Sequence, residues 1–100
     1  MRIVAVLLTW LLIAGCTSVP EDASGEEIFS LVCARCHGSN LEGGVGPKLA
    51  GADAPSADKP DDYLTTTISR GKGRMPAFRA TLSEEQIERV VGYVREQQTG

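Results

Sequence analysis

The residues Cys33-Ala34-Arg35-Cys36-His37 form a C-x-x-C-H motif, which is the most informative segment of the chain. Two cysteines at positions i and i+3 near a helix end share one face, so both thiols can add to the two vinyl groups of one haem. The adjacent His37 is then held under the iron as a ligand. Covalent attachment keeps a haem in a domain too small to enclose it by packing alone. The motif therefore predicts one haem c, bound through Cys33 and Cys36.

Three other kinds of site use similar residues. A thioredoxin-like redox pair requires a β-α-β context, which this sequence lacks. A structural zinc site needs four protein ligands, whereas only Cys33, Cys36 and His37 remain among the cysteines and histidines once Cys16 is set aside as a candidate site of lipid attachment. A disulfide between the two motif cysteines would be stable in an oxidising compartment, but it leaves His37 unexplained. Haem attachment is the interpretation that uses all three side chains.

Met75 is the candidate ligand for the other face of the iron. His37 is the only histidine, so a second histidine from this chain is excluded, and the only other methionine is Met1. Met75 lies in the segment Gly71-Lys72-Gly73-Arg74-Met75-Pro76-Ala77-Phe78, which has no helical stripe for a core residue to join. A methionine ordinarily fills gaps in a core. In this loop that is the weaker interpretation, and an axial ligand is the stronger one.

Three helices are predicted from capping signals and from the spacing of apolar residues. The first runs over about 25–34 and opens on a capping box formed by Ser24 and Glu27. The second is expected over 60–70, with Pro60 in its first turn. Another capping box opens the last helix, whose apolar stripe recurs at positions i, i+3, i+4 and i+7. The residues of that box and stripe are Ser83, Gln86, Ile87, Val90, Val91 and Val94.

Long loops separate these helices. Residues 38–59 and 71–82 are punctuated by Gly and Pro, and neither segment shows strand alternation or a helical stripe. Loops longer than about 12–15 residues are uncommon in a compact domain unless they have a function. Aromatic residues make up only 5% of the chain, so side chains alone would give a small core. We therefore expect an all-α class with about three main helices, whose loops wrap around one covalently bound haem.

The N-terminus is predicted to be an export signal. Residues 3–14 are apolar except for one Thr, and this run is shorter than the roughly 20 residues of a membrane span. The run ends in Leu12-Ile13-Ala14-Gly15-Cys16, which resembles the bacterial lipoprotein cleavage box. The resemblance implies removal of residues 1–15 and lipidation of Cys16. Residues 17–23 show no apolar periodicity, so we expect 16–23 to be a short lipid-anchored tether and 24–100 to be the domain. An ordinary signal peptide and an uncleaved anchor are the alternatives, and all three place the domain outside the cytoplasm, on the periplasmic side or at the cell surface.

Charge and composition exclude several classes of function. The chain carries 10 Lys and Arg against 13 Asp and Glu, a net charge of −3, and it has no long basic run. Such a chain is a poor binder of nucleic acid. No carboxylate pair, nucleophile–base set or phosphate-binding loop is visible in the sequence, so we expect no enzymatic activity.

One loop is locally basic despite the acidic total. Four bases and no acids lie between residues 70 and 79. This loop is predicted to surround the exposed haem edge and to dock an acidic redox partner through transient electrostatic contacts. The alternative is a merely solvated loop. The bases are Arg70, Lys72, Arg74 and Arg79.

Taken together, the motif and the methionine loop resemble those of class I c-type cytochromes, close to the small monohaem cytochromes of bacterial respiratory chains. The likeness covers about residues 24–98 and rests mainly on the segments 33–37 and 71–78, in that order and spacing. In the family, a G-x-x-x-F pattern on the first helix lets the last helix cross closely. The matching residues are Gly25 and Phe29, with Tyr93 at the partner position on the last helix.

The resemblance also implies how the haem is held. Gly46-Pro47-Lys48-Leu49 is similar to a family pattern in which the Pro carbonyl accepts the Nδ1–H of the proximal His, which fixes the ring and strengthens it as a ligand. The Trp and Tyr that bind the buried propionate in mitochondrial-type members have no clear counterpart, and Tyr63 is not clearly placed to substitute. The basic candidates for that role are Lys59, Arg70 and Arg74. The residues expected to pack against the haem are Leu49, Leu64, Ile68 and Phe78.

Ligation by His37 and Met75 would fill both axial positions of the iron, leaving no site for oxygen or peroxide and raising the reduction potential. The resemblance therefore implies a monomeric single-electron carrier of a respiratory or photosynthetic chain. The implied partners are membrane complexes such as a terminal oxidase, a quinol:cytochrome c reductase or a dehydrogenase. Two alternatives are an accessory haem subunit of a larger complex and a haem-based sensor, in which Met75 dissociates and a small ligand binds.

Overall fold

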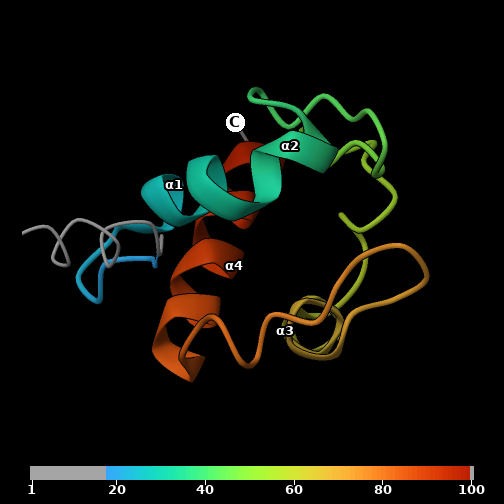
Figure 1. Cartoon of the computed structure of the whole chain (residues 1–100). Coiled ribbons are helices and arrows are strands. Elements are labelled where there is room, and N and C mark those ends of the chain that lie inside the picture. The colour runs from blue at the N-terminus through green and yellow to red at the C-terminus, as the bar shows by residue number, and fades with distance from the viewer. Residues whose placement is uncertain (1–17, 100) are drawn as a thin grey trace, which may run out of the picture.

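The computed structural model describes residues 18–99, and the predicted signal peptide and Cys16 lie outside this range. The described helices are α1 (Gly25–Ile28), the π-helical segment η2 (Phe29–Cys33), α2 (Ala34–His37), α3 (Asp61–Arg70) and α4 (Glu84–Thr99). An isolated bridge between Lys72 and Met75 is the only β feature among the described residues. The all-α class is confirmed, with α1, η2 and α2 following one another without a break (Figure 1).

The first helical run begins where the sequence predicts and ends later. The Ser24 hydroxyl accepts from the Glu27 N–H at 3.1 Å, and the Glu27 carboxylate accepts from the Ser24 N–H at 2.8 Å, so the capping box is confirmed. The run continues to His37 rather than ending at residue 34, because the first residue that leaves helical geometry is Gly38, with φ of 86°. That left-handed conformation suits glycine and ends the helix.

The middle of this run, η2, is π-helical, which the sequence did not predict. The N–H of Ala34 donates to the carbonyl of Phe29, five residues earlier. A π turn inserts one residue into an α-helix and rotates the residues after the turn relative to those before it. Because η2 ends at Cys33, it sets the direction in which the C-x-x-C-H motif faces relative to α1.

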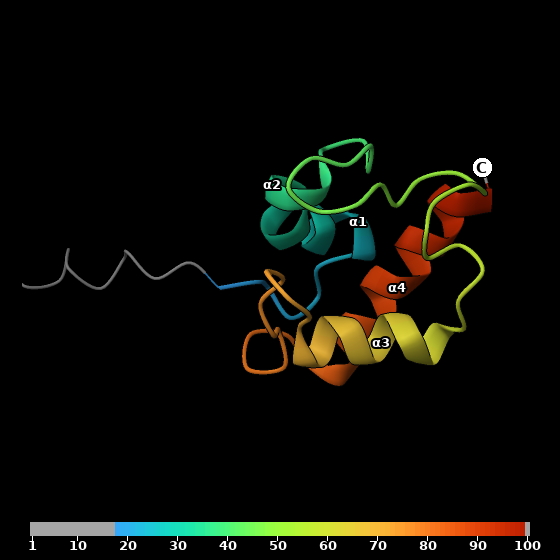
Figure 2. The ribbon, with the colours of Figure 1, turned by 90° about the vertical axis from the view of Figure 1, so that its right-hand side faces the viewer.

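Helix α4 is the centre of the fold and contacts both α1 and α3 (Figures 1 and 2). The crossing with α1 is close, because a Cβ on Gly25 would lie only 2.2 Å from the Arg89 carbonyl oxygen. Beside it, the rings of Phe29 and Tyr93 lie 5.7 Å apart. Gly25, Phe29 and Tyr93 thus meet where α1 crosses α4, as the family resemblance implies. The apolar stripe of α4 is buried, namely Ile87, Val90, Val91 and Val94.

The segment before α1 also packs on α4. The Gln86 side-chain amide donates to the Pro20 carbonyl at 3.0 Å, across 66 residues of sequence. The Arg89 guanidinium donates to the Ala23 carbonyl, and Ala23 is only 3% exposed. The packed domain therefore begins earlier than the boundary drawn from composition, and residues 20–23 are not a free tether.

The long loop before α3 is fastened to α4 mainly by Arg95, with a further hydrogen bond from the Gln98 side-chain amide to the Ser56 hydroxyl at 3.0 Å. The Arg95 guanidinium donates to the Asp61 carboxylate at 2.8 Å, to the Ser56 carbonyl at 3.3 Å and to the Lys59 carbonyl. Pro60 takes the N-cap position of α3, one residue before the first turn in which the sequence placed it. These contacts hold the loop, which lines the main cavity of the domain through Ser56 and Lys59.

Candidate haem site

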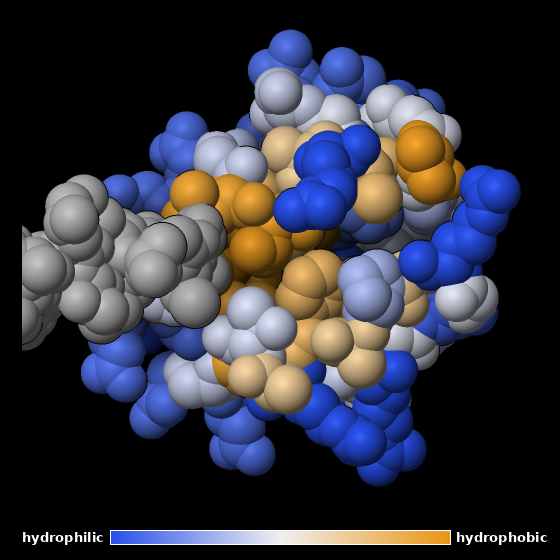
Figure 3. Space-filling view, viewed as in Figure 1, coloured by the Kyte–Doolittle hydropathy of each residue, from blue (hydrophilic) through white to orange (hydrophobic). Residues whose placement is uncertain are grey.

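A cavity of about 890 Å³ lies between the C-x-x-C-H motif, α3 and the two long loops. Cofactor sites usually measure about 300–1,000 Å³ and are mostly apolar. Figure 3 shows an apolar hollow on this face, with hydrophilic side chains around it and across it. The residues predicted to pack against the haem all line the cavity, namely Leu49, Leu64, Ile68 and Phe78.

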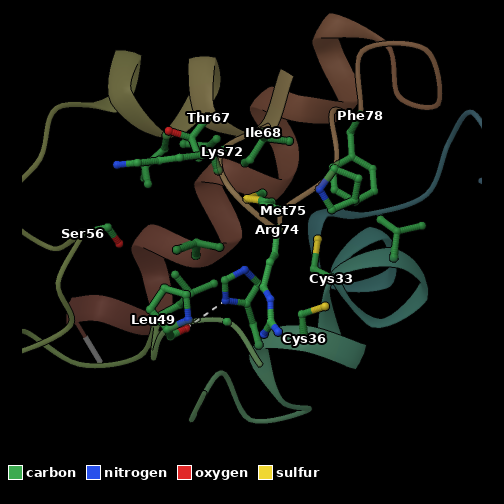
Figure 4. Close-up of a pocket in the computed structure, with 18 of the residues that line it drawn as sticks. Cys33, Cys36, Leu49, Ser56, Thr67, Ile68, Lys72, Arg74, Met75 and Phe78 are labelled. Carbon is green, nitrogen blue, oxygen red and sulfur yellow. Dashed lines mark hydrogen bonds between the residues drawn. The ribbon is translucent and has the colours of Figure 1, made fainter. Parts of the chain in front are cut away.

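The two motif thiols lie at one side of this cavity (Figure 4). Both are free, with Cys33 buried and Cys36 half-buried. Burial raises the pKa of the Cys33 thiol to about 11, and the neighbouring Cys36 adds to the rise. The raised pKa keeps Cys33 a neutral thiol at neutral pH in the absence of a bound group. Within residues 18–99 no three His, Cys, Asp or Glu side chains converge as metal ligands.

His37 ends α2 and is held in one orientation. Its Nδ1 donates to the Pro47 carbonyl at 2.8 Å, so the hydrogen bond implied by the family resemblance is present. The carbonyl can only accept, which fixes the proton on Nδ1 and leaves Nε2 as the free nitrogen. The residue is 8% exposed and lines the cavity. The imidazole is therefore presented to the cavity with its ligating nitrogen unused.

Gly46 is a site residue to which sequence reasoning gave no role. A Cβ at this position would lie 2.8 Å from Cε1 and 3.0 Å from Nδ1 of His37, closer than packed carbons approach. Its N–H also donates to the Cys36 carbonyl at 2.7 Å. Only a residue without a side chain lets the loop pass this close to the ring. A glycine directly before Pro47 was the available signal.

Met75 lines the cavity from the loop after α3. Two reciprocal backbone hydrogen bonds with Lys72, of 2.9 and 3.1 Å, form a tight turn around it. Gly71, with φ of 80°, makes room for the turn, since a Cβ there would lie 2.6 Å from the Met75 carbonyl oxygen. Figure 4 shows Met75 beside Ile68 and Thr67, away from Cys36, with Arg74 extending between them in this view.

The charges that line the cavity all have one sign. Two of the four predicted docking bases, Lys72 and Arg74, line the cavity, whereas Arg70 and Arg79 are exposed outside its lining. Three further bases come from other segments, and no Asp or Glu is among the lining residues. They are Arg35, Lys48 and Lys59. The basic rim is thus assembled by the fold from three segments, namely α2, the loop before α3 and the loop after it, and the loop at 70–79 supplies only part of it.

Comparisons with known proteins agree with this geometry. A family model described as cytochrome C oxidase, cbb3-type, subunit III matches residues 20–94. A cytochrome c6 of Rippkaea orientalis is 39% identical over 95 residues, which cover 90% of this chain and 78% of that protein. The crystal structure of cytochrome c6C from Synechococcus sp. PCC 7002 matches with a TM-score of 0.64 and 31% identity, over 75% of this chain and 95% of that one. A chain in the crystal structure of p-cresol methylhydroxylase with substrate bound matches with a TM-score of 0.60 and 29% identity, over 78% and 97% of the two chains.

The residues present fit a covalently bound haem. The cavity has the size and apolar lining that a macrocycle needs, two free thiols stand at one side, and an oriented imidazole faces into it. The family match covers the whole of this constellation. The chain therefore belongs to the c-type cytochromes and is a small electron carrier, with one haem c joined covalently to Cys33 and Cys36.

Proposed function

We infer that this cytochrome passes single electrons between membrane-bound redox complexes with His37 and Met75 as the axial ligands of its haem. The observation that carries the inference is the cavity lined by both side chains, with His37 already oriented through Pro47 at 2.8 Å. The haem supplies a one-electron iron couple, and histidine with methionine ligation favours the ferrous state. The protein's own contribution is to hold both ligands in place and to exclude water.

The backbone around His37 supports a rigid ligand. The ring is fixed by Pro47 on its Nδ1 side and covered by Gly46 on one face. A hydrogen bond to Nδ1–H also makes the imidazole a stronger donor to iron. Little movement is then needed when the iron changes oxidation state, which suits rapid electron transfer.

Replacing Gly46 with alanine should disturb this ligand without removing it. The added Cβ, 2.8 Å from Cε1 in the present geometry, must push the ring or the loop aside. We expect an increased high-spin fraction of ferric haem in the absorption and electron paramagnetic resonance spectra. Gly44→Ala in the same turn is the control, because its Cβ would meet only the Cys36 carbonyl oxygen, at 3.3 Å. Equal spectra for Gly46→Ala and the wild type would remove Gly46 from the ligand support.

Docking is proposed to use the basic rim of the cavity together with Arg70 and Arg79, which lie outside the cavity lining. Arg70, Lys72, Arg74 and Arg79 are exposed, and none of them forms an ion pair within the described residues. Free positive charges beside an exposed haem edge would attract an acidic surface and orient it for transfer. The proposed partners are a terminal oxidase, a quinol:cytochrome c reductase or a dehydrogenase.

The salt dependence of oxidation by ferricyanide, a small trivalent anion, tests the rim. The net charge of −3 alone predicts that salt accelerates this reaction, because like charges are screened. A basic rim predicts the opposite, a stopped-flow rate that falls as ionic strength rises. The double variant Arg70→Gln/Arg79→Gln should lose roughly a few-fold in rate at low ionic strength. A wild-type rate that rises with salt would contradict docking through the rim and these two arginines.

A second candidate function is that of a permanent subunit. The match to a chain of the p-cresol methylhydroxylase structure, over 97% of that chain, supports an accessory haem subunit that serves one enzyme. Extraction from native membranes in mild detergent separates the candidates. Co-elution in fixed stoichiometry with an oxidase or dehydrogenase identifies a subunit, whereas elution alone identifies a free carrier.

We also propose an extracytoplasmic location, with a lipid anchor on Cys16. Cys16 lies outside the described residues, and among residues 18–99 no helix has the length and apolar character of a membrane span. The proposal rests on the cleavage-box resemblance of residues 12–16. Because packing already begins at Pro20, only a few residues would separate the lipid from the domain. The haem would then be held close to membrane partners.

A further inference from the structure

The positive charge around the haem cavity is largely uncompensated. Among the described residues only two ion pairs occur, Lys48 with Asp53 and Arg95 with Asp61. The remaining cavity bases have no carboxylate partner, although like charges gathered at an apolar cavity repel one another. The charged side chains that line the cavity are Arg35, Lys48, Lys59, Lys72 and Arg74, and the other titratable ones are Cys33, Cys36, His37 and Tyr63. A haem brings two carboxylates of its own to this site, its propionates.

Two of these bases are built into one cluster around Tyr63. The Lys72 ammonium donates to the Tyr63 phenol oxygen at 3.0 Å and lies 5.3 Å from the ring centroid. The Lys59 ammonium lies 5.9 Å from the same centroid. The hydrogen bond from Lys72 lowers the pKa of Tyr63. Because the phenol oxygen accepts from Lys72, its own O–H is free to donate to an anion.

The cluster lies at the appropriate side of the cavity. In a haem the two propionates occupy the edge opposite the two vinyl groups, and Cys33 and Cys36 fix the vinyl edge. Figure 4 shows Lys72 extending away from both cysteines, toward the side of the cavity where Ser56 lies. Lys59 lies three residues after Ser56 in the loop that Arg95 fastens to α4 through the carbonyls of both residues. The loop before α3 and the loop after it thus place hydrogen-bond donors, Lys59 and Lys72, at the side of the cavity opposite the two cysteines.

We propose that Tyr63, Lys59 and Lys72 bind the haem propionates, in place of the Trp and Tyr of mitochondrial-type cytochromes. The proposal rests on the haem attachment through Cys33 and Cys36. The phenol O–H and the two ammonium groups donate to the carboxylate oxygens, and the ammonium charges neutralise them. Arg95 acts as a positioning residue, since it holds the backbone of Lys59. Of the three basic candidates named from the sequence, this assignment keeps Lys59 and replaces Arg70, which does not line the cavity, and Arg74.

The test compares two double variants of the haem-loaded protein that each remove two positive charges. Lys59→Gln/Lys72→Gln alters the cluster, and Arg70→Gln/Arg79→Gln removes bases outside the cavity lining. Loss of the ammonium groups should raise the propionate pKa by about one to three units. Since ferric iron favours the ionised propionate, the cluster variant should have a lower midpoint potential that falls further between about pH 5 and 8. The wild type and the arginine variant should show a nearly flat potential over that range.

The assignment is overturned if the two double variants have the same midpoint potential and the same pH profile. This holds whether both variants differ from the wild type or neither does. Because Lys72 forms backbone hydrogen bonds with Met75, the Met–iron charge-transfer band of the ferric protein is recorded in each variant. If the lysine variant loses that band, its potential no longer reports on the propionates alone. Tyr63→Phe then provides the test, since it removes only the phenol O–H. Tyr63→Phe with an intact band should shift the pH profile, and an unchanged profile would overturn the proposal. A wild type without the band would instead contradict the axial ligation by Met75.

Discussion

Replacing Met75 with alanine is expected to convert the six-coordinate haem into one with an open axial position. The ferric protein should lose its Met–iron charge-transfer band and become high-spin, and the ferrous protein should bind carbon monoxide at once. The midpoint potential should fall by a large part of the roughly 0.8 V over which axial ligands tune haem, because the thioether stabilises ferrous iron. Absorption spectra and a redox titration measure all three effects.

The matched control for this change is Phe78→Leu. Phe78 lines the same cavity from the same loop, and its N–H holds that loop to α3 through the Ile68 carbonyl at 2.9 Å. It has no sulfur, so Phe78→Leu should keep the band and most of the potential. A Met75→Ala protein with an unchanged band and potential would show that another group fills the second axial position. A sensor requires Met75 to leave the iron, so ready binding of carbon monoxide by the wild type would favour the sensor over the carrier.

Replacing Gly25 with alanine is expected to lower the free energy of unfolding by about 3 kcal/mol, the upper end of the usual cost of overpacking. The new Cβ would lie 2.2 Å from the Arg89 carbonyl oxygen and 3.0 Å from the Tyr93 Cβ. Both neighbours belong to the body of α4, so neither can move aside as a flexible side-chain end would. The two helices must separate, which also loosens the Phe29–Tyr93 contact. Denaturant unfolding of the haem-loaded protein, followed by circular dichroism, measures the loss.

Gly92→Ala is a control on α4, for which the expected change in the free energy of unfolding has the opposite sign. Gly92 is exposed in α4, and a Cβ there would meet nothing within 4 Å. Alanine should therefore stabilise the helix by up to about 1 kcal/mol through its higher propensity. If Gly25→Ala unfolds at the same denaturant concentration as the wild type, the close crossing of α1 and α4 is not what holds the fold together.

Features that depend on neighbouring residues were predictable from the sequence. The capping boxes at Ser24 and Ser83 are both present, because a cap involves side chains only three residues apart. The apolar stripe of α4 is buried, since a period of 3.6 residues creates one apolar face wherever the helix packs. The C-x-x-C-H motif identified the cofactor for the same reason, because its chemistry lies within five consecutive residues.

Other features were not predictable. The π turn that ends at Cys33 changes a local hydrogen-bond register without changing the residue pattern. Some contacts between distant residues also left no signal in the sequence. The packing of Pro20 on Gln86 joins residues 66 positions apart. The basic rim likewise needs the fold, because Arg35 and Lys59 reach the cavity from separate segments that no local spacing relates. Only the arrangement of α3, α4 and the loops brings these groups to one site.

Intact-mass analysis of the protein extracted from its native membranes, with a reduced-minus-oxidised spectrum of the same sample, tests the central claim most directly. We expect one haem per chain, retained after denaturation, with both motif thiols consumed and a c-type absorption band. The same mass spectrum reports whether Cys16 carries lipid. A colourless protein, or one in which Cys33 and Cys36 hold zinc or form a disulfide, would contradict the assignment of this chain as a haem-bearing electron carrier.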